Sequence, residues 1–183
     1  HLGTDVADGA VAIVGTLQDP HDAGRLITDP RLTRRFLQRA GSVIEMHWPG
    51  SFLDWSDGRV HLLLPSRGGP DAAAVEAEAV SFAGRLLSAT RETVPGVALT
   101  LALSRFTPQP ERLGAALEEA RLAHSIGERL GRIGEVVTFE ETGVYKLLFR
   151  VLADHPDELT RFYEQTIAGL MQYDAARQTD LVA

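Results

Sequence analysis

The residues of this chain whose types could do chemistry are carboxylates and histidines, and they are scattered along the sequence. Asp5, Asp8 and Asp19 flank the first apolar segment, where carboxylates could ligate a metal ion at its ends. The six histidines contain no pair at i and i+4 and no glutamate at the spacing of a zinc site. Because no matching cluster of further ligands accompanies them, the three aspartates are better interpreted as solvated loop acids. The sequence therefore predicts no metal site.

Motifs for nucleophilic catalysis and phosphate binding are missing from the sequence. The chain has no cysteine, which excludes disulfides, thiolate metal sites and a cysteine nucleophile. Neither Gly-x-Ser-x-Gly nor Gly-x-x-x-x-Gly-Lys-Ser/Thr occurs, and Arg67-Gly68-Gly69 lacks the lysine of a phosphate loop. Arg34, Arg35 and Arg39 form a basic cluster, for which an anion contact is conceivable and a solvated helix face is favoured. No cofactor is expected.

Three aromatic residues, Trp48, Phe52 and Trp55, crowd a polar, turn-rich stretch that ends at Gly58. Aromatic side chains this dense on a loop can line a ligand pocket or a partner surface. Alternatively, they fold back as a lid over the edge of a sheet. The sequence leaves both interpretations open, and this stretch is the preferred place to look for a ligand or partner.

Composition limits the class of protein and its partners. The chain has 183 residues, of which 44% are hydrophobic, as in an ordinary globular domain with a core. Its net charge of −7 repels phosphate backbones, so direct binding of DNA or RNA is not expected. No apolar run approaches the roughly 20 residues of a membrane helix, and the first residues do not resemble a signal peptide. We expect a cytoplasmic protein without a membrane partner.

Apolar periodicity predicts strands alternating with amphipathic helices. Asp29-Pro30 begins the first helix and Gly41 ends it, while Asp57-Gly58 marks a tight hairpin turn. The predicted strands cover residues 10–17, 42–46, 60–64, 97–104 and 135–139, and the predicted helices begin near residues 30, 71 and 111. This β-α-β-β-α-β-α-β order predicts an α/β (α+β) domain with a mixed sheet flanked by helices.

The chain becomes entirely helical in character after Thr142-Gly143, and we place the domain boundary there, with one domain in residues 1–142 and a helical extension in residues 143–183. One apolar stripe of the extension can pack on the sheet domain. A second stripe contains Phe162, Ile167 and Leu170, and a second copy of the chain is the simplest way to bury it. The sequence therefore predicts an output surface at these residues and a homodimer.

The order of elements, with a turn at the middle hairpin, resembles the GGDEF fold of diguanylate cyclases. The segments Val136–Leu148 and Phe162–Leu181 look like the PucR/CdaR family of bacterial transcriptional regulators, and Arg121–Gly131 fits that family's helix before the last strand. In such proteins a degenerate GGDEF-like domain precedes a C-terminal helix-turn-helix. The resemblance implies that residues 1–142 form that domain and that residues 143–183 lead to a DNA-binding module absent from this chain.

The end of the sequence agrees with this implication. No Gly, Asn or Pro follows Leu181-Val182 to stop the last predicted helix. We therefore expect the reading frame to continue past Ala183 into a helix-turn-helix, and we expect contact with DNA only through that module.

The resemblance also locates a degenerate signature motif. Counted back from the apolar strand before Pro65, the Gly-Gly-Asp/Glu-Glu-Phe positions of an active cyclase correspond here to Ser56, Asp57, Gly58, Arg59 and Val60. Two-metal phosphoryl chemistry needs carboxylates to hold Mg²⁺ against the triphosphate. The acidic pair has become Gly and Arg, and a cation at Arg59 would repel the metal. Asp57 is better explained as the first residue of the tight turn.

Two functions follow from these observations. The first is a non-catalytic regulatory and dimerisation domain of a PucR/CdaR-type transcriptional regulator, with an effector molecule that the sequence does not identify. The alternative is a nucleotide-binding or residually active diguanylate-cyclase-like enzyme domain. The hairpin at Ser56–Val60 favours the first, so we expect no catalytic residues and no enzymatic activity.

Overall fold

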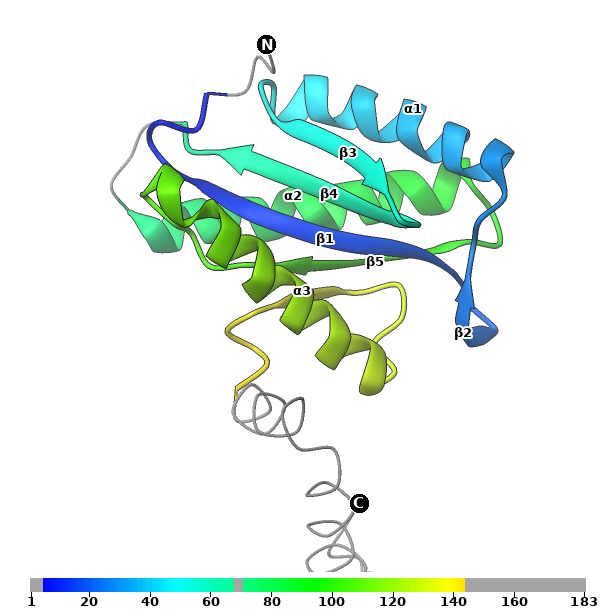
Figure 1. The fold of residues 1–183 in the computed structure, drawn as a ribbon. Coiled ribbons are helices and arrows are strands. Elements are labelled where there is room, and N and C mark those ends of the chain that lie inside the picture. Colours follow the sequence, from blue (N-terminus) through cyan, green and yellow to red (C-terminus); the bar gives the residue numbers. More distant parts are fainter. Residues whose placement is uncertain (1–4, 68–70, 144–183) are drawn as a thin grey trace, which may run out of the picture. The chain divides into compact units, whose positions relative to one another are not determined.

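The computed structural model describes residues 5–67 and 71–143, and the structural statements below concern this part of the chain. By its contacts the chain divides into two compact units, His1–Gly143 and Val144–Ala183, of which the second lies outside the described residues. The elements of the first unit, shown in Figure 1, are β1 (Ala10–Asp19), β2 (Asp22–Leu26), α1 (Pro30–His47), β3 (Phe52–Ser56), β4 (Arg59–Pro65), α2 (Ala72–Thr93), β5 (Ala98–Leu103), the 3₁₀ turn η1 (Pro110–Arg112), α3 (Leu113–Arg129) and β6 (Val136–Thr138).

The strands form one mixed sheet in the order β3-β4-β1-β5-β6, with β2 paired to the end of β1. Only β5 and β6 are parallel, and the other pairings are antiparallel. Strand β1 is central because it pairs with β4 on one side and β5 on the other. Its residues from Ala10 to Gln18 are all buried, as expected for a strand covered on both faces. The predicted α/β class with a mixed sheet is confirmed.

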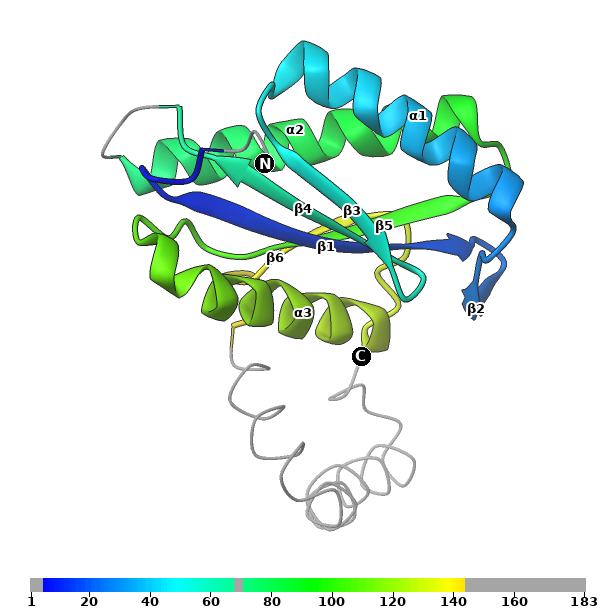
Figure 2. The ribbon, with the colours of Figure 1, turned by 45° about the horizontal axis from the view of Figure 1, so that its top comes forward.

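Helices cover both faces of this sheet (Figure 2). Helices α1 and α2 lie on one face and enclose the larger core, which includes Phe36, Trp48 and Phe82. Helix α3 lies on the other face, where the core is built mainly from small residues such as Ala12, Ala116 and Ala120. Because alanines let α3 approach β1 closely, polar side chains on this face are brought within hydrogen-bonding distance of the helix.

The prediction of a strand over residues 42–46 was wrong, because α1 continues through them to His47. The β-branched pair Val43-Ile44 after Gly41 suggested a strand. However, Phe36, Ala40, Val43 and Ile44 follow a helical spacing, and all four are buried. Burial of this continuous stripe outweighs the roughly 1 kcal/mol that a glycine costs inside a helix. The predicted start of the helix is confirmed, since the Asp29 carboxylate accepts a hydrogen bond from the backbone N–H of Arg31 at 2.8 Å.

The middle hairpin therefore uses a different first strand from the one predicted. Strand β3 pairs with β4, and Ser56 lies opposite Arg59 across the turn. Strand β2 was not predicted either, since it is only five residues long and contains a glycine. The helix predicted to begin near residue 71 and the strand predicted over 97–104 are confirmed as α2 and β5. In the described residues no helix is long and apolar enough to cross a membrane.

Candidate functional site

The tip of the β3–β4 hairpin holds the residues that the sequence analysis aligned with a catalytic motif. Asp57 and Gly58 both have positive φ, 53° and 74°, and they form the two-residue turn between Ser56 and Arg59. Two positive φ values in succession are the signature of a type I′ turn, which an Asp-Gly pair adopts readily. The predicted Asp-Gly hairpin turn is confirmed, and Asp57 has a structural reason to be where it is.

The two hairpin positions aligned with the acidic pair carry no carboxylate. The Ser56 hydroxyl donates a hydrogen bond to Asp54 Oδ2 at 2.8 Å, so the nearby acid is engaged within β3. Gly58 has no side chain, and Arg59 carries a positive charge. Within residues 5–67 and 71–143, no three His, Asp or Glu side chains come together as ligands for a metal ion. The acidic oxygen ligands that Mg²⁺ prefers are therefore limited at the hairpin tip to Asp54 and Asp57.

The strand registers align polar residues in a row on the face covered by α3. Ser56 lies opposite Arg59, Arg59 opposite Thr16, and Thr16 opposite Thr100 across four neighbouring strands. Directly opposed residues point to the same side of a sheet. That side faces α3, because Thr16 Oγ1 lies 3.1 Å from His124 Nε2. The hairpin motif therefore lies at one end of a row of polar residues beneath α3, which we call the polar seam.

A buried hydrogen-bond network connects residues of this polar seam with α3. Gln18 Nε2 donates to Glu128 Oε1 at 3.0 Å, and Thr100 Oγ1 donates to Gln18 Oε1 at 2.8 Å while accepting from the N–H of Gly134 at 3.0 Å. His124 Nδ1 lies 3.5 Å from Glu128 Oε2. The side chains of Gln18 and His124 are only 1% exposed. Buried polar groups of this kind are costly unless satisfied, and here each finds a partner.

The sequence analysis missed this network. The sequence features that could have indicated the network were polar residues inside otherwise apolar strands, namely Thr16 and Gln18 in β1 and Thr100 in β5. On α3 the corresponding signal was the i, i+4 pair His124 and Glu128, of which His124 lies among the helix's buried residues. The hydrogen-bonded pair Gln18 and Glu128 is separated by 110 positions in the sequence, so the association becomes visible only through the strand order.

Glu128 gives the network a pH dependence that can be measured. Its pKa is lowered, first by the hydrogen bond from His124, with burial acting in the opposite direction and Arg59 adding a smaller attraction. A carboxylate with a lowered folded-state pKa contributes stability above its unfolded pKa, and that stability is lost as pH falls through the folded value. We expect Glu128→Gln to be less stable than the wild type at pH 7 and to lose less stability towards pH 3.5. Urea unfolding at the two pH values measures this difference.

The matched control is Glu118→Gln on the same helix. Glu118 forms a surface ion pair with Arg121 and its side chain is 67% exposed, so its replacement should leave the pH profile close to that of the wild type. The assignment of this pH-dependent stability to Glu128 is wrong if the Glu128→Gln and wild-type proteins lose the same stability on acidification.

Trp48, the first of the three aromatic residues singled out in the sequence, is a core residue. It caps the C-terminus of α1 and is 1% exposed. Its ring meets Phe82 of α2 edge-on with 5.7 Å between centroids, and its Nε1–H donates to the carbonyl of Pro65 at 2.9 Å. Trp48 thus ties the end of α1 to α2 and to the end of β4.

Phe52 and Trp55, the other two aromatic residues, lie on β3 and point to opposite faces of the sheet. Trp55 packs against Phe36 of α1 with 6.0 Å between ring centroids. Phe52 lies opposite Leu63, which belongs to the small core under α3. The structure therefore does not gather the three rings into one surface, although Phe52 and Trp55 both remain partly exposed.

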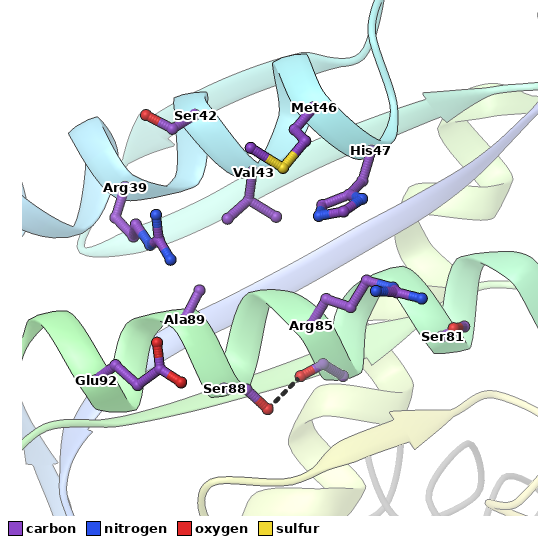
Figure 3. Close-up of a pocket in the computed structure, with 11 residues that line it drawn as sticks. Arg39, Ser42, Val43, Met46, His47, Ser81, Arg85, Ser88, Ala89 and Glu92 are labelled. Atoms are coloured by element: carbon purple, nitrogen blue, oxygen red, sulfur yellow. Dashed lines mark hydrogen bonds between the residues drawn. The ribbon is translucent and has the colours of Figure 1, made fainter.

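The basic cluster Arg34, Arg35 and Arg39 is divided between two environments. Arg34 is exposed, and Arg35 donates to the carbonyl of Thr93 at 2.7 Å. Arg39 instead lines a solvent-open groove of about 650 Å³ between α1 and α2, shown in Figure 3, which we name the α1–α2 groove. Its Nε–H is buried and has no acceptor among the described residues. Phe162, Ile167 and Leu170, the predicted output surface, lie outside the described residues.

Comparison with known protein families gives a match over most of the described domain. The model of a family described as GGDEF-like domain matches residues 1–126, which is more than half of the chain. The matched range includes the β3–β4 hairpin and most of α3. No curated protein matches the chain.

Proposed function

Since this chain belongs to the family of GGDEF-like domains, we propose that it is a non-catalytic regulatory domain of a bacterial transcriptional regulator of the PucR/CdaR type. The observation that carries the proposal is the tip of the β3–β4 hairpin. Gly58 and Arg59 stand where a cyclase of this fold needs acidic residues, and Asp57 is committed to a type I′ turn. A fold that keeps its hairpin without the ligands for two-metal chemistry is suited to bind a ligand or to transmit a signal rather than to catalyse a reaction.

The regulatory part of the proposal rests on sequence. The segments Val136–Leu148 and Phe162–Leu181 resemble the PucR/CdaR family, in which a helix-turn-helix follows such a domain. The net charge of −7 makes the chain itself unsuited to bind DNA, so contact with DNA is assigned to that separate module. We include a homodimer in the proposal, because the apolar stripe through Phe162 and Leu170 needs a partner.

We predict that the purified chain does not convert GTP to a cyclic dinucleotide with Mg²⁺ or Mn²⁺. Arg59→Glu should remain inactive as well, because Ser56 and Asp57 still occupy the positions of the two glycines that let the backbone approach a nucleotide. Chromatography of the reaction mixture measures the product, and light scattering on the same sample measures the mass expected for a dimer.

Product formed by the wild-type chain would refute the non-catalytic assignment. Thermal stabilisation by GTP and Mg²⁺ without turnover would instead favour the alternative function, a nucleotide-binding domain. A monomeric mass would remove the homodimer from the proposal and leave the absence of turnover as a separate result.

A further inference from the structure

Small residues on the side of α2 that faces α1 help to keep the α1–α2 groove open. Ser81, Gly84, Ser88 and Ala89 line its lower side, and a Cβ built on Gly84 would meet no atom within 4 Å. The Ser88 hydroxyl donates to the carbonyl of Gly84 at 3.0 Å, which Figure 3 shows as a dashed line, so this side chain folds back onto its own helix. The two helices therefore leave a gap whose volume is within the range of small-molecule sites.

The groove carries an excess of positive charge on a protein that is negative overall. Two arginines, Arg39 from α1 and Arg85 from α2, enter it against a single acid, Glu92. The guanidinium groups of Arg39 and Arg85 form no hydrogen bond or ion pair with any residue in the ranges 5–67 and 71–143. In Figure 3 the Arg39 side chain extends from α1 towards α2, and the His47 ring and the Arg85 side chain face each other across the gap.

Arg39 supplies the strongest single observation. Its Nε is buried, yet no acceptor reaches it among the described residues. An unsatisfied buried donor costs about 1–3 kcal/mol, and more when the group is charged. Among the described residues that are not exposed, only Arg39 Nε and the Ser66 hydroxyl oxygen are buried side-chain polar atoms without a hydrogen-bond partner. An oxyanion in the groove would provide the missing acceptor.

The rest of the lining limits what else the ligand contains. Val43 and Ala89 form a buried apolar floor, while Met46 is 73% exposed at the mouth of the groove. A flexible thioether at such a position can fold over an apolar group of varied shape. The groove thus combines two free guanidinium groups with a short apolar surface between the helices.

We propose that the α1–α2 groove binds a small organic oxyanion, a carboxylate or a phosphate ester, through Arg39 and Arg85. Guanidinium groups match both oxyanions with paired N–H···O bonds, and the hydroxyl of Ser81, which also lines the groove, can add a polar contact. The binding itself follows from the charge and geometry of the groove. Its meaning as the effector site of a regulatory domain rests on the proposed function.

The test uses the full chain labelled with ¹⁵N and two probes, inorganic phosphate and succinate, each compared with sodium chloride at matched ionic strength. Two-dimensional NMR follows the Nε–Hε resonance of Arg39, which is assigned by its loss in Arg39→Gln. We expect a saturable shift of this resonance with at least one probe and none with chloride. Arg85→Gln should weaken that binding at least tenfold.

The matched control is Arg34→Gln, which removes an exposed arginine from α1 outside the groove and should leave the affinity unchanged. Arg85 is exposed, so its substitution tests the site even if Arg39→Gln fails to fold. The site is refuted if neither probe gives a saturable shift, or if Arg85→Gln and Arg34→Gln weaken binding equally. It is also refuted if the resonance responds only to protein concentration, which would mean that a second copy covers the groove. None of these results alters the turnover assay that tests the proposed function.

Discussion

Replacement of Trp48 by alanine is expected to lower the free energy of unfolding by about 3–5 kcal/mol, the usual cost of removing a large buried aromatic side chain. The residue is 1% exposed, it packs edge-on against Phe82, and it hydrogen-bonds the carbonyl of Pro65. Truncation would leave a cavity between α1 and α2 and an unpaired carbonyl at the end of β4. Because domains of this size are stable by only about 5–15 kcal/mol, a substantial part of the stability would be lost.

Urea unfolding followed by circular dichroism measures this change. Trp55→Ala is the matched control, because Trp55 is the only other tryptophan and remains partly exposed on β3. We expect its cost to be less than half that of Trp48→Ala. Equal costs at the two positions would contradict the assignment of Trp48 to the core and would reopen the interpretation of these aromatics as one surface.

Replacement of Gly15 by alanine is expected to destabilise the domain by about 1–3 kcal/mol through overpacking at the centre of the sheet. A Cβ at this position would lie 2.5 Å from the carbonyl oxygen of Thr100 and 2.5 Å from Leu101 Cδ2. The first of these contacts is with backbone, so β1 and β5 would have to separate. Since β1 is the central strand, that displacement would reach both neighbouring strands.

Gly41→Ala provides a control in which the same substitution should raise, rather than lower, the free energy of unfolding. Gly41 lies inside α1, and a Cβ there would meet no atom within 4 Å. Alanine favours the helix over glycine by about 0.5–1 kcal/mol, so this variant should be stabilised. Thermal and urea unfolding of both variants measure the two changes in stability. A destabilised Gly41→Ala would argue against the continuous α1 that replaces the predicted strand at residues 42–46.

The error at residues 42–46 shows why local patterns were insufficient. Val43 and Ile44 have the β-branched side chains typical of a strand, and Gly41 resembles a helix end. What keeps them helical is burial of the stripe shared with Phe36 and Ala40 against the sheet and α2. That contribution depends on distant residues such as Phe82, which is 38 positions after Ile44, and a short sequence window does not contain it.

The sequence by itself determined those features that depend on neighbouring residues or on composition. The Asp57-Gly58 turn follows from the need for two positive φ values, the start of α1 from the Asp29 cap, and α2 and β5 from their apolar periodicity. Likewise, the sequence alone shows Gly58 and Arg59 at the positions aligned with the acidic pair of the cyclase motif. Only the tertiary structure decided how distant residues meet: Trp48 against Phe82, Gln18 against Glu128, and Arg39 and Arg85 as lining residues of the same α1–α2 groove. These contacts come from strand order and helix packing, which reflect burial summed over the whole domain rather than the preference of any one segment.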